Sequence, residues 1–304
     1  SSFHPDQLEH PDLPSLPRLV LRISHRTVSV SRTDMSPHEY PAPMRVMGIV
    51  NVTPDSFSDG GLCLDPGKAV EHGLELLEAG AQVLDVGGES TRPGAAEVPA
   101  DEEMARVVPV IERLAGRAPV SIDTTKASVA EAAIAAGATI VNDVSALRAD
   151  PEMAGICADR GVSVVLMHMI GTPRTMQDDP RYDDVVEEVA GFLGERALFA
   201  ESEGIDAGSI WVDPGIGFGK TVEHNLALIA ATGRFAELGY PVLVGPSRKA
   251  FIGRIDGSGV EDRLGGTIAA CLAARAGGAA MVRVHDVGAV SQAIRIAESI
   301  DAST

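Results

Sequence analysis

The chain has 304 residues, which suffices for one large domain or two small ones, and 45% of them are hydrophobic, enough for a substantial core. Its formal net charge is −18. Because so acidic a molecule repels nucleic acids and anionic membrane surfaces, we expect neither as a partner. The cysteines Cys63, Cys157 and Cys271 form no CxxC pair, and there is no signal-peptide pattern or 18-residue apolar run. The composition therefore predicts a cytoplasmic protein.

Residues 1–43 differ in composition from the rest of the chain, since they are rich in Pro, His, Ser and Arg. Within them, residues 19–31 partly alternate between apolar and polar types, a pattern that permits a short strand or hairpin. We interpret residues 1–43 as an N-terminal extension, either a native arm or a vector-derived leader, with disorder as one expectation. Residues 44–304 are then a single folded domain.

From residue 44 onward, short apolar runs rich in β-branched residues alternate with segments of helical spacing. The apolar runs lie at residues 45–50, 82–84, 119–122, 139–141, 162–167, 209–212, 241–244 and 280–284. Helical segments lie between most of them, for example at residues 66–78, 127–136, 182–203 and 266–276. Apolar runs separated by helices indicate parallel strands buried on both faces. Eight such units predict an α/β fold, a (β/α)8 TIM barrel, with an open doubly wound sheet as the alternative.

Polar or charged residues stand at or just after the end of each apolar run. They are Asn51, Asp85, Asp123, Asn142, Asp143, His168, Asp213, Ser247, Arg248, Lys249, Arg283, His285 and Asp286. In a (β/α)8 barrel the C-terminal ends of all strands meet at one mouth, so these residues would converge on one site. For any single acid or amide, helix capping is the simpler explanation. A packed core role explains His168 as well as a site role does.

Capping does not explain the cations among the residues that follow the strands. Cations favour helix C-termini, whereas five of them precede helices: Arg92, Arg248, Lys249, Arg283 and His285. Several cations at helix N-termini predict a shared anion.

The glycine-rich segment at residues 215–221 is a tight turn rather than a nucleotide-binding loop. It fails the P-loop pattern because Pro214 stands where the first glycine is required. The sequence has no HExxH or other metal-ligand spacing. A bound metal would therefore be a loosely held Mg²⁺ on oxygen ligands and substrate phosphates.

Eight segments, in chain order, resemble the signatures of the dihydropteroate synthases, a family of pterin-binding enzymes. They lie at residues 47–61, 85–94, 121–126, 142–145, 166–169, 213–220, 245–249 and 283–286. The resemblance covers residues 44 to about 300, with one departure at Ala146, where many members have glycine. It implies a transferase of folate biosynthesis that joins a dihydropterin pyrophosphate to p-aminobenzoate with the help of Mg²⁺. It also implies a homodimer and inhibition by sulfonamides.

The resemblance further implies the residues of the site. The pterin would be held by Asp123, Asn142, Met167, Asp213, Phe218 and Lys249. The pyrophosphate would be held by Asn51, Arg92, Arg283 and His285, with Mg²⁺ near Asn51. The p-aminobenzoate pocket would be formed by Phe57, Thr91, Arg92, Pro93, Ser247 and Lys249. The catalytic residues would be Asp123, Lys249, Arg283 and His285.

Two other functions remain open at this point. A pterin-binding methyltransferase on the same barrel would share the Asp and Asn contacts to the pterin, but would not need residues 247–249 and 283–285 for pyrophosphate. A catalytically inactive pterin-binding paralogue is the other alternative. The presence of Asn51, Lys249, Arg283 and His285 in this chain argues against it.

Overall fold

The computed structural model describes residues 43–53, 66–90, 96–172 and 175–303. All of them lie in Tyr40–Thr304, the second of two units into which the chain divides. The predicted N-terminal extension lies outside the described residues except for Pro43, so its boundary with the folded domain stays a prediction. Among the described helices, none combines the length and apolar character that crossing a membrane requires.

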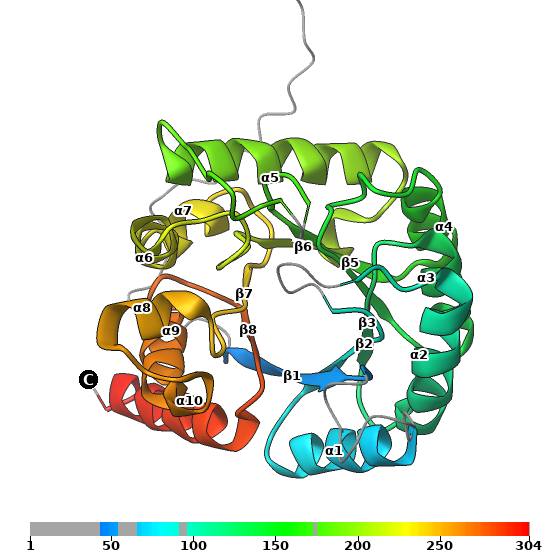
Figure 1. The fold of residues 1–304 in the computed structure, drawn as a ribbon, viewed down its shortest axis with the longest axis horizontal. Coiled ribbons are helices and arrows are strands. Elements are labelled where there is room, and N and C mark those ends of the chain that lie inside the picture. Colours follow the sequence, from blue (N-terminus) through cyan, green and yellow to red (C-terminus); the bar gives the residue numbers. More distant parts are fainter. Residues whose placement is uncertain (1–42, 54–65, 91–95, 173–174, 304) are drawn as a thin grey trace, which may run out of the picture. The chain divides into compact units, whose positions relative to one another are not determined.

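Strands and helices alternate along the described chain (Figure 1). The strands are β1 (Arg45–Asn51), β2 (Val83–Gly87), β3 (Val120–Asp123), β4 (Ile140–Asp143), β5 (Ser163–Met167), β6 (Ile210–Asp213), β7 (Leu243–Val244) and β8 (Met281–Val284). The helices are α1 (Pro66–Glu78), α2 (Ala100–Leu114), α3 (Ala127–Ala135), α4 (Met153–Arg160), α5 (Val185–Ser202), α6 (Val222–Ala230), α7 (Thr232–Ala236), α8 (Ala250–Asp256), α9 (Leu264–Ala276) and α10 (Val287–Asp301). Two short 3-10 helices, η2 (Ala207–Ser209) and η3 (Val260–Asp262), complete the set.

The strands form one parallel sheet in the order β6-β5-β4-β3-β2-β1-β8-β7. The end strand β6 meets the segment just before β7 through a parallel bridge between Val212 and Val242, and the Val212 N–H donates to the Pro241 carbonyl at 3.0 Å. The sheet thus closes on itself, with the helices around it (Figure 1). The predicted (β/α)8 barrel is confirmed, and an open doubly wound sheet is excluded because it would leave its end strands apart.

Local sequence explains where several elements begin. Helix α5 starts at Val185, three residues later than the predicted segment, because the Asp184 side chain caps it by accepting from the N–H groups of Val186 and Glu187. Strand β7 is shorter than its predicted run at residues 241–244. Pro241 has no N–H to donate to a strand ladder.

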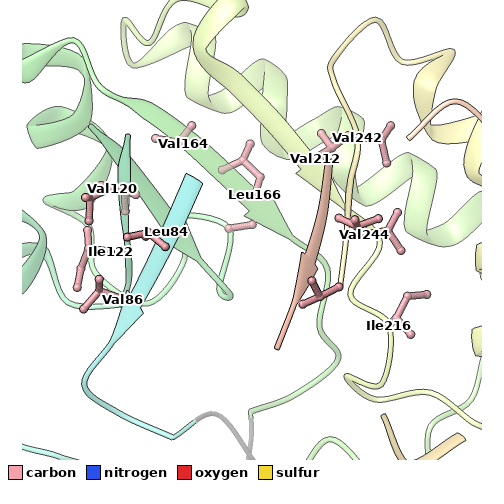
Figure 2. Packing of buried hydrophobic residues seen from close by; sticks show 14 of the residues in the cluster. Leu84, Val86, Val120, Ile122, Val164, Leu166, Val212, Ile216, Val242 and Val244 are labelled. Carbon is pink, nitrogen blue, oxygen red and sulfur yellow. The ribbon is translucent and has the colours of Figure 1, made fainter. Parts of the chain in front are cut away.

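Buried apolar residues form two layers that follow the alternation of side chains along a strand. The outer layer lies between the strands and the helices and includes the residues labelled in Figure 2. The inner layer fills the barrel interior: Met47, Val83, Ile140, Val165, Trp211, Leu243 and Met281. On each strand the next inward position lies two residues towards the C-terminus from that inner layer, and so nearer the mouth of the barrel. The alternation therefore decides which side chains line the site.

Candidate active site

Most inward positions at the C-terminal ends of the strands hold polar residues, with Met167 on β5 as an apolar exception. On β8, Val282 and Val284 belong to the outer layer and Met281 to the inner layer, so Arg283 faces inward. The same alternation turns Asp85 on β2 and Asp213 on β6 inward. Asn51, Asp123, Asn142 and Met167 occupy the matching positions on β1, β3, β4 and β5. Six of the predicted site residues therefore face the barrel interior near its mouth, together with Asp85.

A network of polar side chains joins four of these strands, β2, β3, β4 and β8. The Arg283 guanidinium donates from Nε to Asp85 Oδ2 at 2.5 Å and from a terminal nitrogen to Asp123 Oδ2 at 2.8 Å. The Asn142 side-chain amide donates to the same Asp85 oxygen at 3.2 Å. Asp85, completely buried, was expected at the mouth of the barrel, but the resemblance assigned it no role in the site. A charged residue at an inward position of an otherwise apolar strand was the signal that could have identified it.

One carboxylate oxygen of Asp123 accepts a hydrogen bond from Arg283, and the other is available to a ligand. Its Oδ1 is buried without a hydrogen-bond partner among the described residues. Burial raises the pKa of Asp123 to about 7, against the lowering effect of Arg283, and the carboxylates of Asp85, Glu103 and Asp143 raise it further. A buried acceptor without a partner costs free energy, so this atom is set to receive a donor from a bound molecule.

A second carboxylate, Asp213, faces the site from β6. Its Oδ1 accepts from the Gly215 N–H at 2.7 Å. Burial raises the pKa of Asp213 to about 6, while the Gly215 N–H and then the charges of Lys249, Lys220 and Arg283 lower it. Two carboxylates with elevated pKa values at one barrel mouth are typical of a functional site.

An apolar wall lies beside the carboxylates. It consists of Val144, Met167, Met169, Met176 and Phe218, all buried. The Lys249 ammonium lies 4.0 Å from the centroid of the Phe218 ring. Next to this wall a cavity of about 490 Å³ opens, with Asp123, Val144 and Met169 in its lining. Carboxylates, a lysine and polarisable sulfur and aromatic groups together suit a flat, nitrogen-rich ring.

The glycine-rich loop after β6 is the tight turn that the sequence predicts, and it packs on the end of β5. Gly215 has φ +67°, and a Cβ there would lie 2.0 Å from the His168 carbonyl oxygen. At Gly217, with φ +85°, a Cβ would meet the Lys249 side chain. Glycine is therefore required at both positions, because only it allows the loop to bring Phe218 against the methionines.

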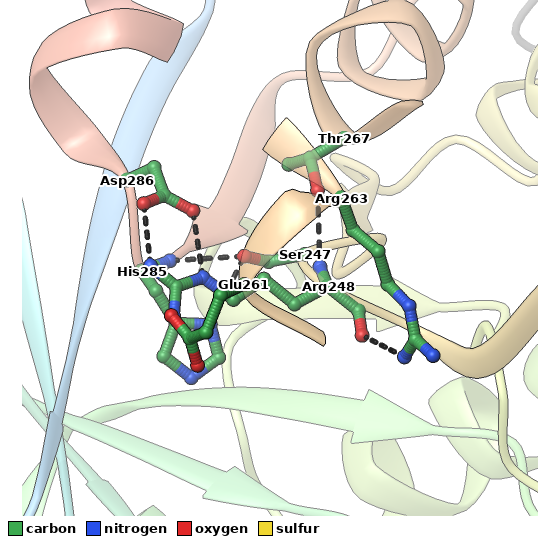
Figure 3. A network of polar contacts seen from close by, with 7 residues as sticks. All are labelled: Ser247, Arg248, Glu261, Arg263, Thr267, His285 and Asp286. Atoms are coloured by element: carbon green, nitrogen blue, oxygen red, sulfur yellow. Dashed lines mark hydrogen bonds and ion pairs between the residues drawn. The ribbon is translucent and has the colours of Figure 1, made fainter. Parts of the chain in front are cut away.

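At the β7 and β8 ends, Ser247 and His285 form a polar pair. The Ser247 hydroxyl lies 3.0 Å from His285 Nδ1 and accepts from the His285 backbone N–H at 3.1 Å (Figure 3). Beside them, Arg248 has φ +53° and donates to both carboxylate oxygens of Asp286, at 2.9 and 2.7 Å, and to Glu261 at 2.9 Å. Ser247 and His285 thus lie together, and Arg248 links the residue that precedes α10 to the 3-10 helix η3.

Pairing changes the interpretation of the cations. The sequence predicts that Arg248 and Arg283 help to bind a shared anion. In the structure each of them instead contacts two carboxylates. Their partners come from elements distant in sequence, which no local pattern reveals. Arg92 lies outside the described residues.

The remaining candidates divide between structural roles and undescribed segments. The Asp143 carboxylate accepts from the N–H groups of Ser145 and Leu147, at 2.7 and 2.8 Å, and so shapes the loop after β4. His168 is buried and packs edge-on against Phe192, with ring centroids 4.9 Å apart. Four predicted p-aminobenzoate residues lie outside the described residues: Phe57, Thr91, Arg92 and Pro93.

Comparison with known proteins matches this site to one family. The model of the family described as "Pterin binding enzyme" matches residues 47–285. The dihydropteroate synthase of Escherichia coli K12 is 46% identical over 256 residues, which are 84% of this chain and 90% of the relative. A Xanthomonas albilineans dihydropteroate synthase solved with 4-aminobenzoic acid is 52% identical, with a TM-score of 0.80, over 85% of this chain and 93% of that one. The same enzyme solved with 7,8-dihydropteroate is 49% identical, with a TM-score of 0.78, over 85% and 94% of the two chains. The chain therefore belongs to the pterin binding enzyme family, among the dihydropteroate synthases.

Proposed function

We propose that this chain condenses 6-hydroxymethyl-7,8-dihydropterin pyrophosphate with p-aminobenzoate, giving 7,8-dihydropteroate and pyrophosphate in folate biosynthesis. The observation that carries the proposal is the buried Asp123 oxygen without a partner, set beside Asp213 and an apolar wall. The similar X. albilineans enzyme has been solved with 4-aminobenzoic acid and with 7,8-dihydropteroate, which are a substrate and the product of this reaction.

The pterin end of the site follows from hydrogen-bonding chemistry. A pterin presents N–H donors on its pyrimidine edge, which the carboxylates of Asp123 and Asp213 and the amide oxygen of Asn142 would accept. Lys249 would donate to the pterin carbonyl and ring nitrogen. Met167 and Phe218 would cover the ring faces, in keeping with their place in the apolar wall.

The pyrophosphate end is proposed at Asn51, Arg283 and His285, together with Arg92. Among the described residues, no group of three or more His, Cys, Asp or Glu side chains is placed to hold a metal ion. The amide oxygen of Asn51, at the end of β1, is a hard donor suited to Mg²⁺. These residues fit a Mg²⁺ that is carried largely by the substrate's phosphates rather than held in a protein cage. When bound, Mg²⁺ would supply charge that stabilises the leaving pyrophosphate.

The reaction exchanges one bond at the pterin methylene for another. The bond from carbon to the pyrophosphate oxygen breaks, the bond from carbon to the amine nitrogen forms, and the amine loses a proton. The aryl amine is nucleophilic in its neutral form, so no activated Ser or Cys is needed. Arg283 and His285 would stabilise the departing anion, and Asp123 the electron-poor methylene.

The p-aminobenzoate end is proposed at Ser247 and Lys249, with Phe57, Thr91, Arg92 and Pro93. Ser247 lies 3.0 Å from His285 Nδ1, so this pocket would adjoin the pyrophosphate end. Sulfonamides, which resemble p-aminobenzoate in shape, are proposed as inhibitors that compete with it.

Product formation tests the function. Purified protein is mixed with the pterin pyrophosphate, p-aminobenzoate and Mg²⁺, and pyrophosphate and dihydropteroate are both measured. We expect equal amounts of the two products and none when any component is omitted. The Asp123→Asn variant should fold and lose most of the activity. Pterin binding without pyrophosphate release would contradict the proposal and favour a methyltransferase or an inactive pterin-binding protein.

We also propose that the protein is a homodimer, joined through α9 and α10. These helices border an apolar groove whose lining includes Ile268, Leu272, Ile296 and Ile300. Ile296 and Ile300 are 57% and 59% exposed and lie together in this apolar groove, and a contiguous exposed apolar patch favours a surface that a partner covers. Sedimentation should give a dimer, and Ile296→Glu should give a monomer. A monomeric wild-type protein at micromolar concentration would refute the proposal.

A further inference from the structure

Lys220 is only 1% exposed, and none of the roles proposed above uses it. It ends the glycine-rich loop that follows β6. Its Nζ lies 3.0 Å from His168 Nδ1, 2.8 Å from the Phe218 carbonyl oxygen and 3.4 Å from the His168 carbonyl oxygen. An ammonium group has three protons to donate, and these three acceptors match them.

The hydrogen bonds of Lys220 fix the state of His168. While Lys220 is protonated it can only donate, so His168 Nδ1 accepts, and the neutral ring carries its proton on Nε2. Burial, and then the charges of Lys220 and Arg148, lower the pKa of His168 to about 3. His168 therefore stays neutral, and all three groups that hold Lys220 are uncharged.

Asp213 is the carboxylate whose negative charge acts on Lys220. Burial lowers the pKa of Lys220 to about 7, the charge of Asp213 raises it, and the charge of Lys249 lowers it. The His168 backbone N–H also donates to the Asp213 carbonyl at 3.0 Å. Lys220 thus acts on Asp213 through charge and on Phe218 through the backbone carbonyl that it holds.

We propose that Lys220 is a positioning residue for the pterin, which supplies positive charge behind Asp213 and fixes the loop that carries Phe218. The inference rests on the proposed function, because that function assigns Asp213 and Phe218 to the pterin. Lys249 and Arg283 also act on Asp213, but both are assigned to substrate. Lys220 is buried behind the loop and supports Asp213 without touching the pterin.

Because the proposed role depends on the charge of Lys220, removing Lys220 should change the KM for the pterin in a way that depends on pH. Ionised Asp213 accepts hydrogen bonds from the pterin edge, whereas protonated Asp213 loses that capacity. Without Lys220 the pKa of Asp213, about 6 in the intact protein, rises. A rise of about one unit predicts that the KM for the pterin is about fivefold above wild type at pH 6 and within about twofold at pH 8. Loss of packing alone would change KM by the same factor at every pH.

The test compares kcat and KM for the pterin pyrophosphate between pH 6 and pH 9, with p-aminobenzoate and Mg²⁺ saturating. Lys220→Met removes the charge at similar volume, and Lys220→Gln, which keeps N–H donors, serves if the first variant does not fold. Lys68→Met makes the same change at an exposed position of α1 and should match wild type. We expect the pH-dependent rise in KM, with kcat within about threefold of wild type.

Two results would overturn the inference: an unchanged KM, or a KM raised by the same factor across the whole pH range. Either leaves the proposed function intact, because wild-type turnover is measured in the same experiment. Absence of turnover by the wild-type protein would instead refute the proposed function itself.

Discussion

Replacing Arg283 by methionine should destabilise the barrel in a way that depends on pH. Arg283 is 21% exposed and contacts Asp85 and Asp123, which are 0% and 9% exposed. Removing one partner of a buried ion pair costs about 3–5 kcal/mol, because the remaining charge is left uncompensated. Since Arg283 keeps some contact with solvent, we expect the low end, about 3 kcal/mol at pH 8.

The pH dependence follows from Asp123. Its pKa in the folded protein, about 7, lies above its unfolded value, so the folded state binds a proton that the unfolded state releases. The stability gained in this way is fully present below pH 4 and is lost as the pH rises through 7. Arg283 lowers this pKa, so its removal raises it further, at about 1.4 kcal/mol for each unit. The loss in the variant should therefore be smaller at pH 5 than at pH 8.

Urea unfolding at pH 5 and pH 8 measures both effects, provided that wild type and variant unfold in two states. The control is Arg160→Met, since Arg160 and its partner Glu131 are 49% and 53% exposed and such a pair contributes less than about 1 kcal/mol. Adding Asp123→Asn to Arg283→Met should recover part of the loss. A loss no greater than that of the control, or one equal at both pH values, would show that the network does not hold Arg283 as a buried cation.

Three further predictions concern backbone strain and ligand binding. Ala146→Gly should change the free energy of unfolding by less than about 1 kcal/mol. Relief of the left-handed conformation at φ +54° is offset by the entropy cost of glycine and by the loss of a fully buried methyl group, and a loss of about 2 kcal/mol or more would contradict this. Gly215→Ala should lower the free energy of unfolding by about 3 kcal/mol or more, since its Cβ would lie 2.0 Å from the His168 carbonyl oxygen. Gly239→Ala, also at positive φ but with open space around it, should lower it by about 1–2 kcal/mol. Equal losses of stability in the two variants would refute the steric argument. Lys249→Ala should lower kcat/KM for the pterin pyrophosphate about tenfold or more, while the unfolding midpoint stays near that of wild type. A large drop in the unfolding midpoint with normal kinetics would count against the assignment of Lys249 to the substrate.

The sequence by itself determined the barrel. The eight apolar runs overlap the eight strands, and the predicted helix at residues 66–78 is α1 (Pro66–Glu78). The reason is that strands buried on both faces and amphipathic helices leave periodic patterns within a few residues of chain. The order of the motifs also gave the family, and the comparisons confirm it. The departure at Ala146 was visible in the sequence, although its positive φ was not.

The tertiary structure alone decided which polar groups pair with one another. Arg283 contacts Asp85 and Asp123, 198 and 160 residues away in sequence, and neither pairing leaves a local pattern. The burial of Lys220 was equally hidden, since a lysine after a glycine-rich turn is usually solvated. Closure of the barrel brings the strand ends together, and only then do burial and distance fix which charges are paired, which pKa values are raised and which acceptor is left for the substrate.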